Sequence, residues 1–194
     1  GLPFAAPING CKLVLPCEKM DGAHLQELIL NEGVTFTGGV PTIWTMYLAH
    51  LEQTGGNAGK LKRVVIGGSA VPRAMAETFK RKYGVQVLQI WGMTETAPLG
   101  VIATPTPALA ALGEDKLDEA IWTRQGRLQF GIELKVVDEN GAEAPHDGET
   151  SGAPATFITY ALVGDDAARD RWRKLARKRW RDLGSPILRA NHKR

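Results

Sequence analysis

Short runs of apolar or alternating residues are separated by segments with helix-like periodicity over the first half of the chain. Each run is followed directly by proline or glycine; the runs lie at residues 11–15, 34–37, 61–66 and 85–91. In the segments that separate these runs, apolar residues recur at helical spacing from Asp21 to Gly33, Pro41 to Leu51 and Pro72 to Gly84. Strands that alternate with helices of about ten residues predict a parallel sheet with right-handed crossover helices.

The pattern changes after Thr96. A Pro- and Ala-rich connection leads to a predicted helix at residues 114–122, and residues 126–138 alternate like a pair of strands with Gly131 between them. Glu139-Asn140-Gly141 is typical of a turn. The pattern therefore predicts an α/β fold, in which a parallel sheet with crossover helices is followed by a small antiparallel β element.

Composition indicates one ordinary globular domain with an appendage. The chain has 194 residues, of which 43% are apolar and 23% charged. No apolar run reaches the roughly 20 residues that a membrane-spanning helix needs, and Gly1 is not an initiator methionine, so we expect a cytoplasmic chain that starts within a longer protein. Cys11 and Cys17 are too few for a disulfide framework, and the scattered histidines predict no protein-ligated transition metal.

Charge divides the chain near residue 152. Residues 1–152 carry 13 Lys and Arg against 17 Asp and Glu, whereas residues 153–194 carry 11 against 4. We therefore expect residues 151–194 to form an unrelated basic tail with an amphipathic helix at 165–183. Such a helix could bind a membrane surface or nucleic acid. The other interpretation is that the end of the sequence is frame-shifted. This interpretation is favoured because runs of charged residues are usually solvated.

Two of the strand ends carry candidate chemistry. Residues 67–70 (GGSA) follow one strand, and Thr94 and Glu95 follow another. Parallel sheets bind ligands beyond the carboxyl ends of their strands, and a hydroxyl beside a carboxylate suits a phosphate with its magnesium ion. The simpler interpretations are a helix-capping pair for Thr94 and Glu95, a tight turn for Gly67-Gly68 and a core position for Trp91.

Three motifs in one order and spacing resemble a known family. They are GGSAVP at 67–72, WGMTE at 91–95 and the pattern GR-x-x-x-G-x-E-x-K-V-V-D-x-x-G at 126–141. Together with GCKLVLP at 10–16 and VTFTGGVPTIW at 34–44, they resemble the adenylate-forming acyl-CoA synthetases. Those enzymes activate a carboxylic acid with ATP and pass the acyl group to coenzyme A. The resemblance covers residues 1–150, as part of an AMP-binding large domain.

The resemblance implies roles for individual residues. Thr94 would contact the α-phosphate and Glu95 would hold Mg²⁺, as the catalytic pair. Trp91, with Gly92 and Met93 after it, would lie beside the adenine. The backbone of Gly67, Gly68, Ser69 and Ala70 would line the adenine pocket. An acyl pocket would involve Gly39, Val40, Leu99 and Gly100. The implied ligands are ATP or AMP, Mg²⁺, coenzyme A and a fatty or other carboxylic acid, with no specific nucleic acid.

The sequence departs from the family pattern in three places. It has no Ser/Thr/Gly-rich phosphate loop, no Tyr-x-Thr-Gly-Asp-like stretch for the ribose and no C-terminal domain with the adenylating lysine. The chain is therefore expected to be an incomplete large domain that is inactive by itself. Two alternatives remain: a non-catalytic remnant whose tail binds a membrane or nucleic acid, and a hydrolase that would use Ser69, Asp138 and His146.

Overall fold

The structure, a computed structural model, describes residues 1–96, 98–129, 132–138, 142–145 and 153–158. The chain divides into two compact units: Gly1–Gly92 with Val101–Arg127, and Met93–Gly100 with Leu128–Arg194. The predicted turn at 139–141 and the predicted tail helix at 165–183 lie outside the described residues. Within those residues, no helix is both long and apolar enough to cross a membrane.

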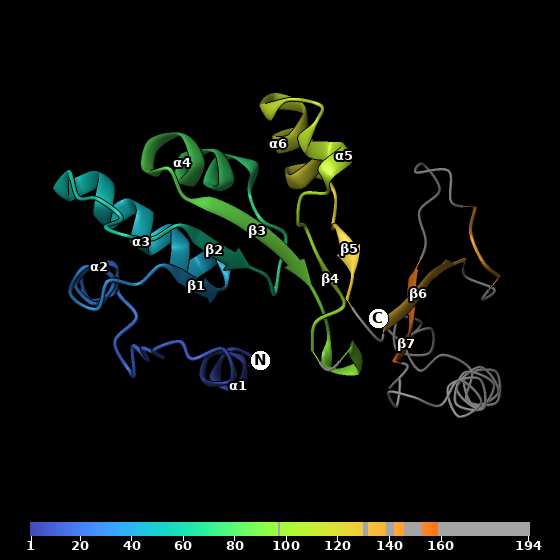
Figure 1. Ribbon diagram of the computed structural model, residues 1–194, viewed down its shortest axis with the longest axis horizontal. Helices are drawn as coiled ribbons and strands as arrows, with labels where there is room; N and C mark the ends of the chain where they lie inside the picture. Colours follow the sequence, from blue (N-terminus) through green and yellow to red (C-terminus); the bar gives the residue numbers. More distant parts are fainter. Residues whose placement is uncertain (97, 130–131, 139–141, 146–152, 159–194) are drawn as a thin grey trace, which may run out of the picture. The chain divides into compact units, whose positions relative to one another are not determined.

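A parallel sheet organises the first unit. Strands β1 (Phe36–Gly39), β2 (Arg63–Ile66) and β3 (Gln86–Trp91) are parallel neighbours, and their arrowheads point the same way in Figure 1. Helices α3 (Pro41–Thr54) and α4 (Arg73–Tyr83) connect them. Strand β4 (Val101–Ile102) then runs antiparallel to β3, and β5 (Arg127–Leu128) follows in the order β1-β2-β3-β4-β5. The predicted α/β fold with a parallel sheet and crossover helices is confirmed.

Helix boundaries follow local chemistry. The Asp21 carboxylate accepts a hydrogen bond from the backbone N–H of His24 at 3.0 Å and so caps α2 (Gly22–Asn31). This bond lowers the pKa of Asp21. Pro41 occupies the first turn of α3, where a missing N–H costs nothing. Gly84 ends α4 in the left-handed conformation, at φ 66°.

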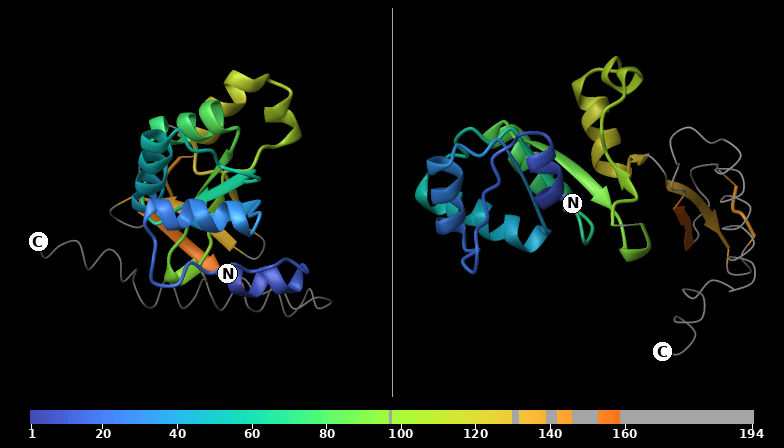
Figure 2. Two further views of the ribbon diagram at one scale, coloured as in Figure 1. Left: turned by 90° about the vertical axis from the view of Figure 1, so that its left-hand side faces the viewer. Right: turned by 60° about the horizontal axis from the view of Figure 1, so that its bottom comes forward.

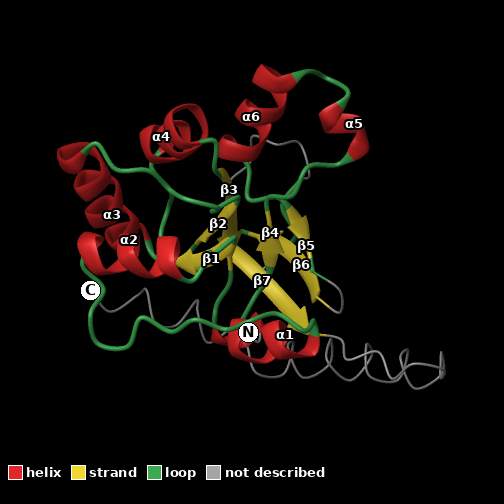
Figure 3. Ribbon diagram, turned by 60° about the vertical axis from the view of Figure 1, so that its left-hand side comes forward, coloured by secondary structure: helices red, strands yellow, loops and turns green. Residues whose placement is uncertain are grey.

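The hydrophobic core lies on the face of the sheet that α2, α3 and α4 cover, while α1 (Leu2–Ile8) lies on the other face (Figure 3). An aromatic cluster fills the core centre. The Trp44 ring stands edge-on to Tyr47 at 6.1 Å and to Phe79 at 6.0 Å, and Tyr47 stacks on Phe79. The Tyr47 hydroxyl and Trp44 Nε1 are buried without a hydrogen-bond partner among the described residues.

Helix α6 (Glu114–Thr123) lies beside α4 (Figure 2), and α5 (Pro107–Ala110) precedes it. Ion pairs join the two longer helices. Lys80 of α4 pairs with Glu114 at 3.0 Å and with Asp118, and Arg73 pairs with Glu119 at 2.8 Å. The helix predicted at 114–122 is thus confirmed, and β4 and α5 lie in the Pro- and Ala-rich connection for which no element was predicted.

Two expectations near the amino terminus are wrong. Residues 11–15 form no strand, because within the described part of the chain no other strand pairs with them, and Leu15 is 62% exposed. The second strand is displaced to Phe36–Gly39 and includes Gly38-Gly39, which were expected to end it. Gly38 remains in the strand because its backbone pairs with Val65, and a Cβ there would meet Leu2 at 3.3 Å.

In the second unit, β6 (Ile132–Val137) pairs antiparallel with β7 (Ala153–Ile158) from Ile132↔Ile158 to Val137↔Ala153. The short 3₁₀ helix η1 (Thr94–Thr96) lies beside β7. An antiparallel element therefore exists, but the expectation that residues 126–138 pair with themselves is wrong. Strand β5 joins the five-stranded sheet, and β6 takes β7, a more distant segment, as its partner.

Candidate active site

Glycines lie side by side at the carboxyl ends of β1 and β2. The carbonyl of Gly39 accepts a hydrogen bond from Gly67 N–H at 3.4 Å. A Cβ placed on Gly68 would lie 3.1 Å from the Val40 side chain. Two residues predicted for the acyl pocket, Gly39 and Val40, thus lie directly beside two predicted for the adenine pocket.

Close packing explains the glycines at the end of β2. A Cβ on Gly67 would lie 2.4 Å from Ile90 Cγ1 of β3, a distance that real side chains do not reach. Gly68 has φ +85°, which L side chains rarely adopt. Beyond them the chain turns outward, so that Gly68, Ser69 and Ala70 are exposed. The pair therefore forms a tight turn, and the backbone from Gly68 onward is accessible to a ligand.

At the end of β3, Trp91 is half-buried rather than a core residue, and Gly92 is exposed. Trp91 is the last β3 residue to pair with β4, opposite Val101. Strand pairing therefore fixes the Trp91 backbone, while part of the residue's surface is accessible.

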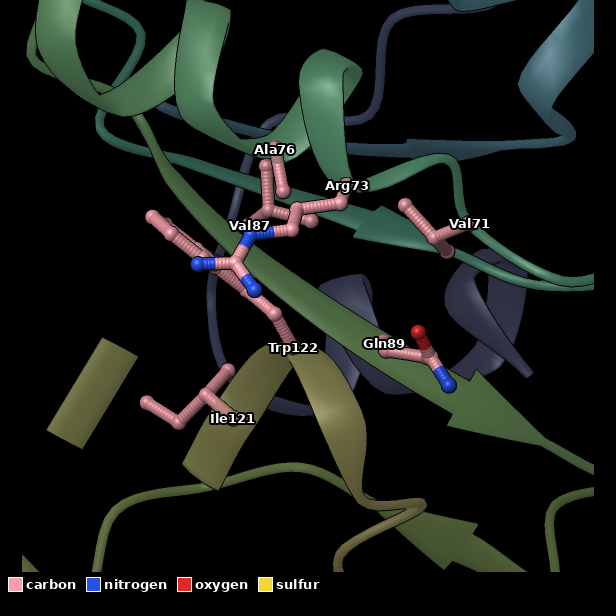
Figure 4. Close-up of a pocket in the computed structure, with 7 residues that line it drawn as sticks. All are labelled: Val71, Arg73, Ala76, Val87, Gln89, Ile121 and Trp122. Carbon is pink, nitrogen blue, oxygen red and sulfur yellow. The ribbon is translucent and has the colours of Figure 1, made fainter. Parts of the chain in front are cut away.

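A shallow pocket lies between β3, α4 and α6 (Figure 4), without an enclosed space large enough for a water molecule. Its lining residues are Val71, Arg73, Ala76, Val87, Gln89, Ile121 and Trp122. Gln89 is 8% exposed as a residue, but its carboxamide is not among the fully buried, unpartnered groups of the described chain, so water can reach it. Sequence reasoning missed Gln89, although a glutamine within the run Val87 to Trp91 was a usable signal.

Charge in this pocket is already compensated. Arg73 pairs with Glu77 at 3.0 Å and Glu119 at 2.8 Å, and its guanidinium lies 5.8 Å from the centre of the Trp122 ring. The hydrogen bond to Glu77 raises the pKa of Arg73. Because two carboxylates already occupy the guanidinium, Arg73 is not available to bind a phosphate.

In the second unit, Thr96 shapes the loop that carries the predicted catalytic pair. Thr96 is 2% exposed. Its hydroxyl accepts a hydrogen bond from Met93 N–H at 2.9 Å and donates one to the Pro98 carbonyl at 2.7 Å. Thr94, in contrast, is exposed. The Glu95 side chain lies outside the described residues. Sequence reasoning missed Thr96, because nothing in the pattern separates it from Thr94.

The predicted residues form two groups, one in each unit. The turn and strand-end group in the first unit consists of Gly39, Val40, Gly67, Gly68, Ser69, Ala70, Trp91 and Gly92. The loop group in the second unit consists of Met93, Thr94, Glu95, Leu99 and Gly100. In the loop group, the Gly100 carbonyl accepts a hydrogen bond from Gln129 N–H at 3.0 Å, which fixes the end of the loop.

The residues of the candidate site fit a magnesium ion that is bound together with a nucleotide. No group of three or more His, Cys, Asp or Glu side chains that could hold a metal ion is found within the described residues. Magnesium bound to nucleotide needs no such cage, because it takes one or two carboxylates with phosphate oxygens and water. A single carboxylate at Glu95 is compatible with that arrangement.

Of the residues named for the hydrolase alternative, Asp138 helps to hold a turn, since its carboxylate accepts a hydrogen bond from Ala142 N–H at 2.8 Å. A triad needs a histidine oriented by the carboxylate. His146 lies outside the described residues, so the hydrolase alternative stays a prediction.

Comparison with known proteins gives a consistent result. The sequence pattern of the AMP-binding enzymes matches residues 2–153. The chain is 42% identical to a medium-chain-fatty-acid–CoA ligase of Ectopseudomonas oleovorans, over 78% of this chain and 28% of that one. It is also 42% identical to a long-chain-fatty-acid–CoA ligase of Thermus thermophilus, over 86% of this chain and 31% of that one. The chain thus spans less than a third of the length of these relatives.

Among solved structures, the fold is similar to that of a long-chain-fatty-acid–CoA ligase from Archaeoglobus fulgidus. The TM-score is 0.57 at 26% identity, over 71% of this chain and 27% of that one. The match includes the strand-end glycines, the WGMTE loop and β6 in one uninterrupted stretch of sequence. The chain therefore belongs to the AMP-binding enzyme family, whose members include the acyl-CoA ligases.

Proposed function

We propose that this chain provides the nucleotide-binding part of an ATP-dependent acyl-CoA ligase, which joins a fatty or other carboxylic acid to coenzyme A in the cytoplasm. The observation that carries the proposal is the turn at Gly67-Gly68, where the carboxyl ends of two parallel strands meet and residues 68–70 are exposed. Parallel sheets bind ligands beyond the carboxyl ends of their strands, and glycines let the backbone approach a flat ring such as a purine closely.

Each residue then has a defined task. The backbone of Gly67 to Ala70 would lie against the base, which only glycine permits at such close range. Gln89 would hydrogen-bond the polar edge of the base, and Trp91 would cover its face. The Thr94 hydroxyl would donate to the α-phosphate, and Thr96 would hold the loop in the required turn. Such a site works by positioning and electrostatics, without a covalent nucleophile.

The metal and the acyl group would use other residues of the two groups. Glu95 would hold Mg²⁺, which supplies neutralisation of phosphate charge when it is bound. Gly39 and Val40, with Leu99 and Gly100, would border the acyl group. Two of these, Gly39 and Val40, lie next to the Gly67-Gly68 turn, so acid and nucleotide would meet at the carboxyl edge of the sheet.

AMP binding to the chain, measured by isothermal titration calorimetry, tests the proposal. Loss of the proposed hydrogen bond to the base in Gln89→Ala is expected to weaken binding about tenfold, and Thr94→Val should weaken it by a smaller factor. The matched controls are Gln53→Ala and Thr54→Val, which remove the same atoms from exposed positions on α3. Unchanged AMP affinity in Gln89→Ala, or no AMP binding by the folded chain, would contradict the assignment.

A further inference from the structure

A basic surface lies at the amino edge of the parallel sheet, the edge opposite to the candidate nucleotide site. It consists of Lys60, Lys62 and Arg63, which lead into β2, and Arg81 and Lys82, which end α4 just before β3. Because β1, β2 and β3 run in the same direction (Figure 1), their amino ends lie at one edge. All five cations are exposed there.

Backbone contacts fix these segments beside one another. Lys62 N–H donates to the Thr35 carbonyl at 2.9 Å, and the Lys62 carbonyl accepts from Gln86 N–H at 2.9 Å. The Lys60 side chain passes 3.8 Å from the position that a Cβ of Gly33 would take. The basic surface is therefore built from the ends of several elements and has a fixed arrangement.

Most of this charge is uncompensated. Lys82 pairs with Glu52 at 3.0 Å, whereas Lys60, Lys62, Arg63 and Arg81 have no ion pair among the described residues. Glu32, at the end of α2, is already paired with Lys12. A set of exposed like charges without carboxylate partners raises the local positive potential and attracts an anionic partner.

Exposed apolar side chains flank the cations. Leu30 is 42% exposed and packs where a Cβ of Gly59 would lie, 2.8 Å from its Cδ2. Phe36 is 40% exposed and is the β1 partner of Arg63 in the sheet register. Lysine and arginine heads beside exposed apolar groups match the interface of an anionic lipid leaflet, where cations meet headgroups and apolar groups reach the acyl boundary. Non-specific binding to duplex DNA would use only the cations, so the exposed apolar side chains beside them are what favours a lipid leaflet.

We propose that the basic surface docks this protein onto an anionic lipid leaflet, with the carboxyl edge of the sheet turned away from the lipid. This orientation follows because the two edges are the opposite ends of the same parallel strands. The proposal does not depend on nucleotide binding, since it uses none of the residues of the candidate active site.

Co-sedimentation with vesicles of phosphatidylglycerol and phosphatidylcholine tests it, with pure phosphatidylcholine vesicles as reference. Each cation near an anionic leaflet contributes about fivefold to binding, so Lys60→Gln/Lys62→Gln/Arg81→Gln should bind roughly a hundredfold more weakly. The conservative variant Lys60→Arg/Lys62→Arg/Arg81→Lys should bind like the original chain. The matched control, Lys19→Gln/Lys116→Gln/Arg124→Gln, removes the same charge from exposed positions elsewhere in the first unit and should keep most of the affinity.

Three results would overturn the proposal. The first is equal loss in both glutamine variants, which would make net charge the cause. The second is absence of vesicle binding by the original chain, or full binding by the basic-surface variant. The third is a variant that loses affinity for duplex DNA while it keeps its affinity for the vesicles, which would assign the surface to nucleic acid. Residues 159–194 are present in every variant and do not distinguish them.

Discussion

Tyr47 shows how a single buried hydroxyl connects packing to pH dependence. The residue is fully buried within the aromatic cluster, and burial raises its pKa from 10.0 to about 12, with a smaller contribution from Tyr83. Its hydroxyl has no hydrogen-bond partner among the described residues. The phenol is therefore neutral in the folded chain at a pH where it ionises in the unfolded chain.

The sign of the effect follows from linkage. Below pH 10 the Tyr47 phenol is protonated in both the folded and the unfolded chain, so its full contribution to the free energy of unfolding is present. Between pH 10 and about 12 the unfolded chain loses the proton first, so the free energy of unfolding falls by about 1.4 kcal/mol per pH unit. Tyr47→Phe should lack this fall and should be at least as stable as the original chain at pH 7, because it removes an unpartnered hydroxyl. Urea unfolding of both proteins at pH 7 and pH 11 measures the difference; parallel pH profiles would contradict it.

Gly67 sets a second limit at the residue scale. Gly67→Ala places a methyl group 2.4 Å from Ile90 Cγ1, and the resulting overpacking should cost about 1–3 kcal/mol in the free energy of unfolding. The control is Gly38→Ala on the neighbouring strand, where the nearest atom is the flexible end of Leu2 at 3.3 Å. Equal urea midpoints for the two variants would show that β3 yields easily at this position.

At the element scale, the α4–α6 pairing depends on Lys80. Partial burial acts to lower the pKa of Lys80, but hydrogen bonds to Asp118 and Glu114 outweigh burial and raise it. Lys80 is 29% exposed and Asp118 14%, so this pair is better shielded than an ordinary surface pair. The pairing holds α6 and its residue Trp122 against the pocket that contains Gln89.

Lys80→Met should therefore loosen α6 more than it destabilises the core. We expect faster hydrogen exchange of the α6 amides, at Glu114–Thr123, with little change in α3. The matched control is Lys116→Met, which removes an exposed charge from α6 that has no ion pair in the described part of the chain. If both variants exchange alike, the ion pair contributes no more than a surface charge does, which is about 0–1 kcal/mol.

Local signals predicted the elements well where chemistry acts at short range. Asp21 and Gly84 mark helix ends in the sequence and in the structure, since a cap needs only its own neighbours. Pairing partners were predicted poorly where they lie far away. Residues 11–15 have the composition of a strand but no partner in the described residues, and β6 pairs with β7 rather than with β5. Strand pairing is decided by distant segments, which periodicity does not report.

The candidate site shows the same division. The turn at Gly67-Gly68 and the end of β3 could be predicted, because strand ends and glycines are visible in the sequence. Thr96 could not, because its importance depends on burial: its hydroxyl is hydrogen-bonded to both Met93 and Pro98. Burial of a single polar residue is a property of the packed molecule, so sequence patterns do not reveal it.

At the scale of the whole molecule, activity is expected to need more than this chain. The chain spans less than a third of the length of the relatives it matches, and the family resemblance implies a phosphate loop, a ribose-binding aspartate and an adenylating lysine that take part in the reaction. We therefore expect the purified chain to give no ATP–pyrophosphate exchange with any fatty acid, measured with labelled pyrophosphate and Mg²⁺. Exchange that disappears in Glu95→Gln would contradict this expectation, and a longer relative serves as the positive control.

The pairing of Trp91 with Val101 has a consequence for how such a site can change. It closes the base of the loop at residues 92–100, because it joins the two strands on either side of that loop. The segment with Thr94 and Glu95 is therefore the loop of a β3–β4 hairpin. A loop whose ends are held together can vary in length at a small cost in loop-closure entropy. Loops exchanged between relatives at these two positions would therefore alter the chemistry of the edge and leave its scaffold intact.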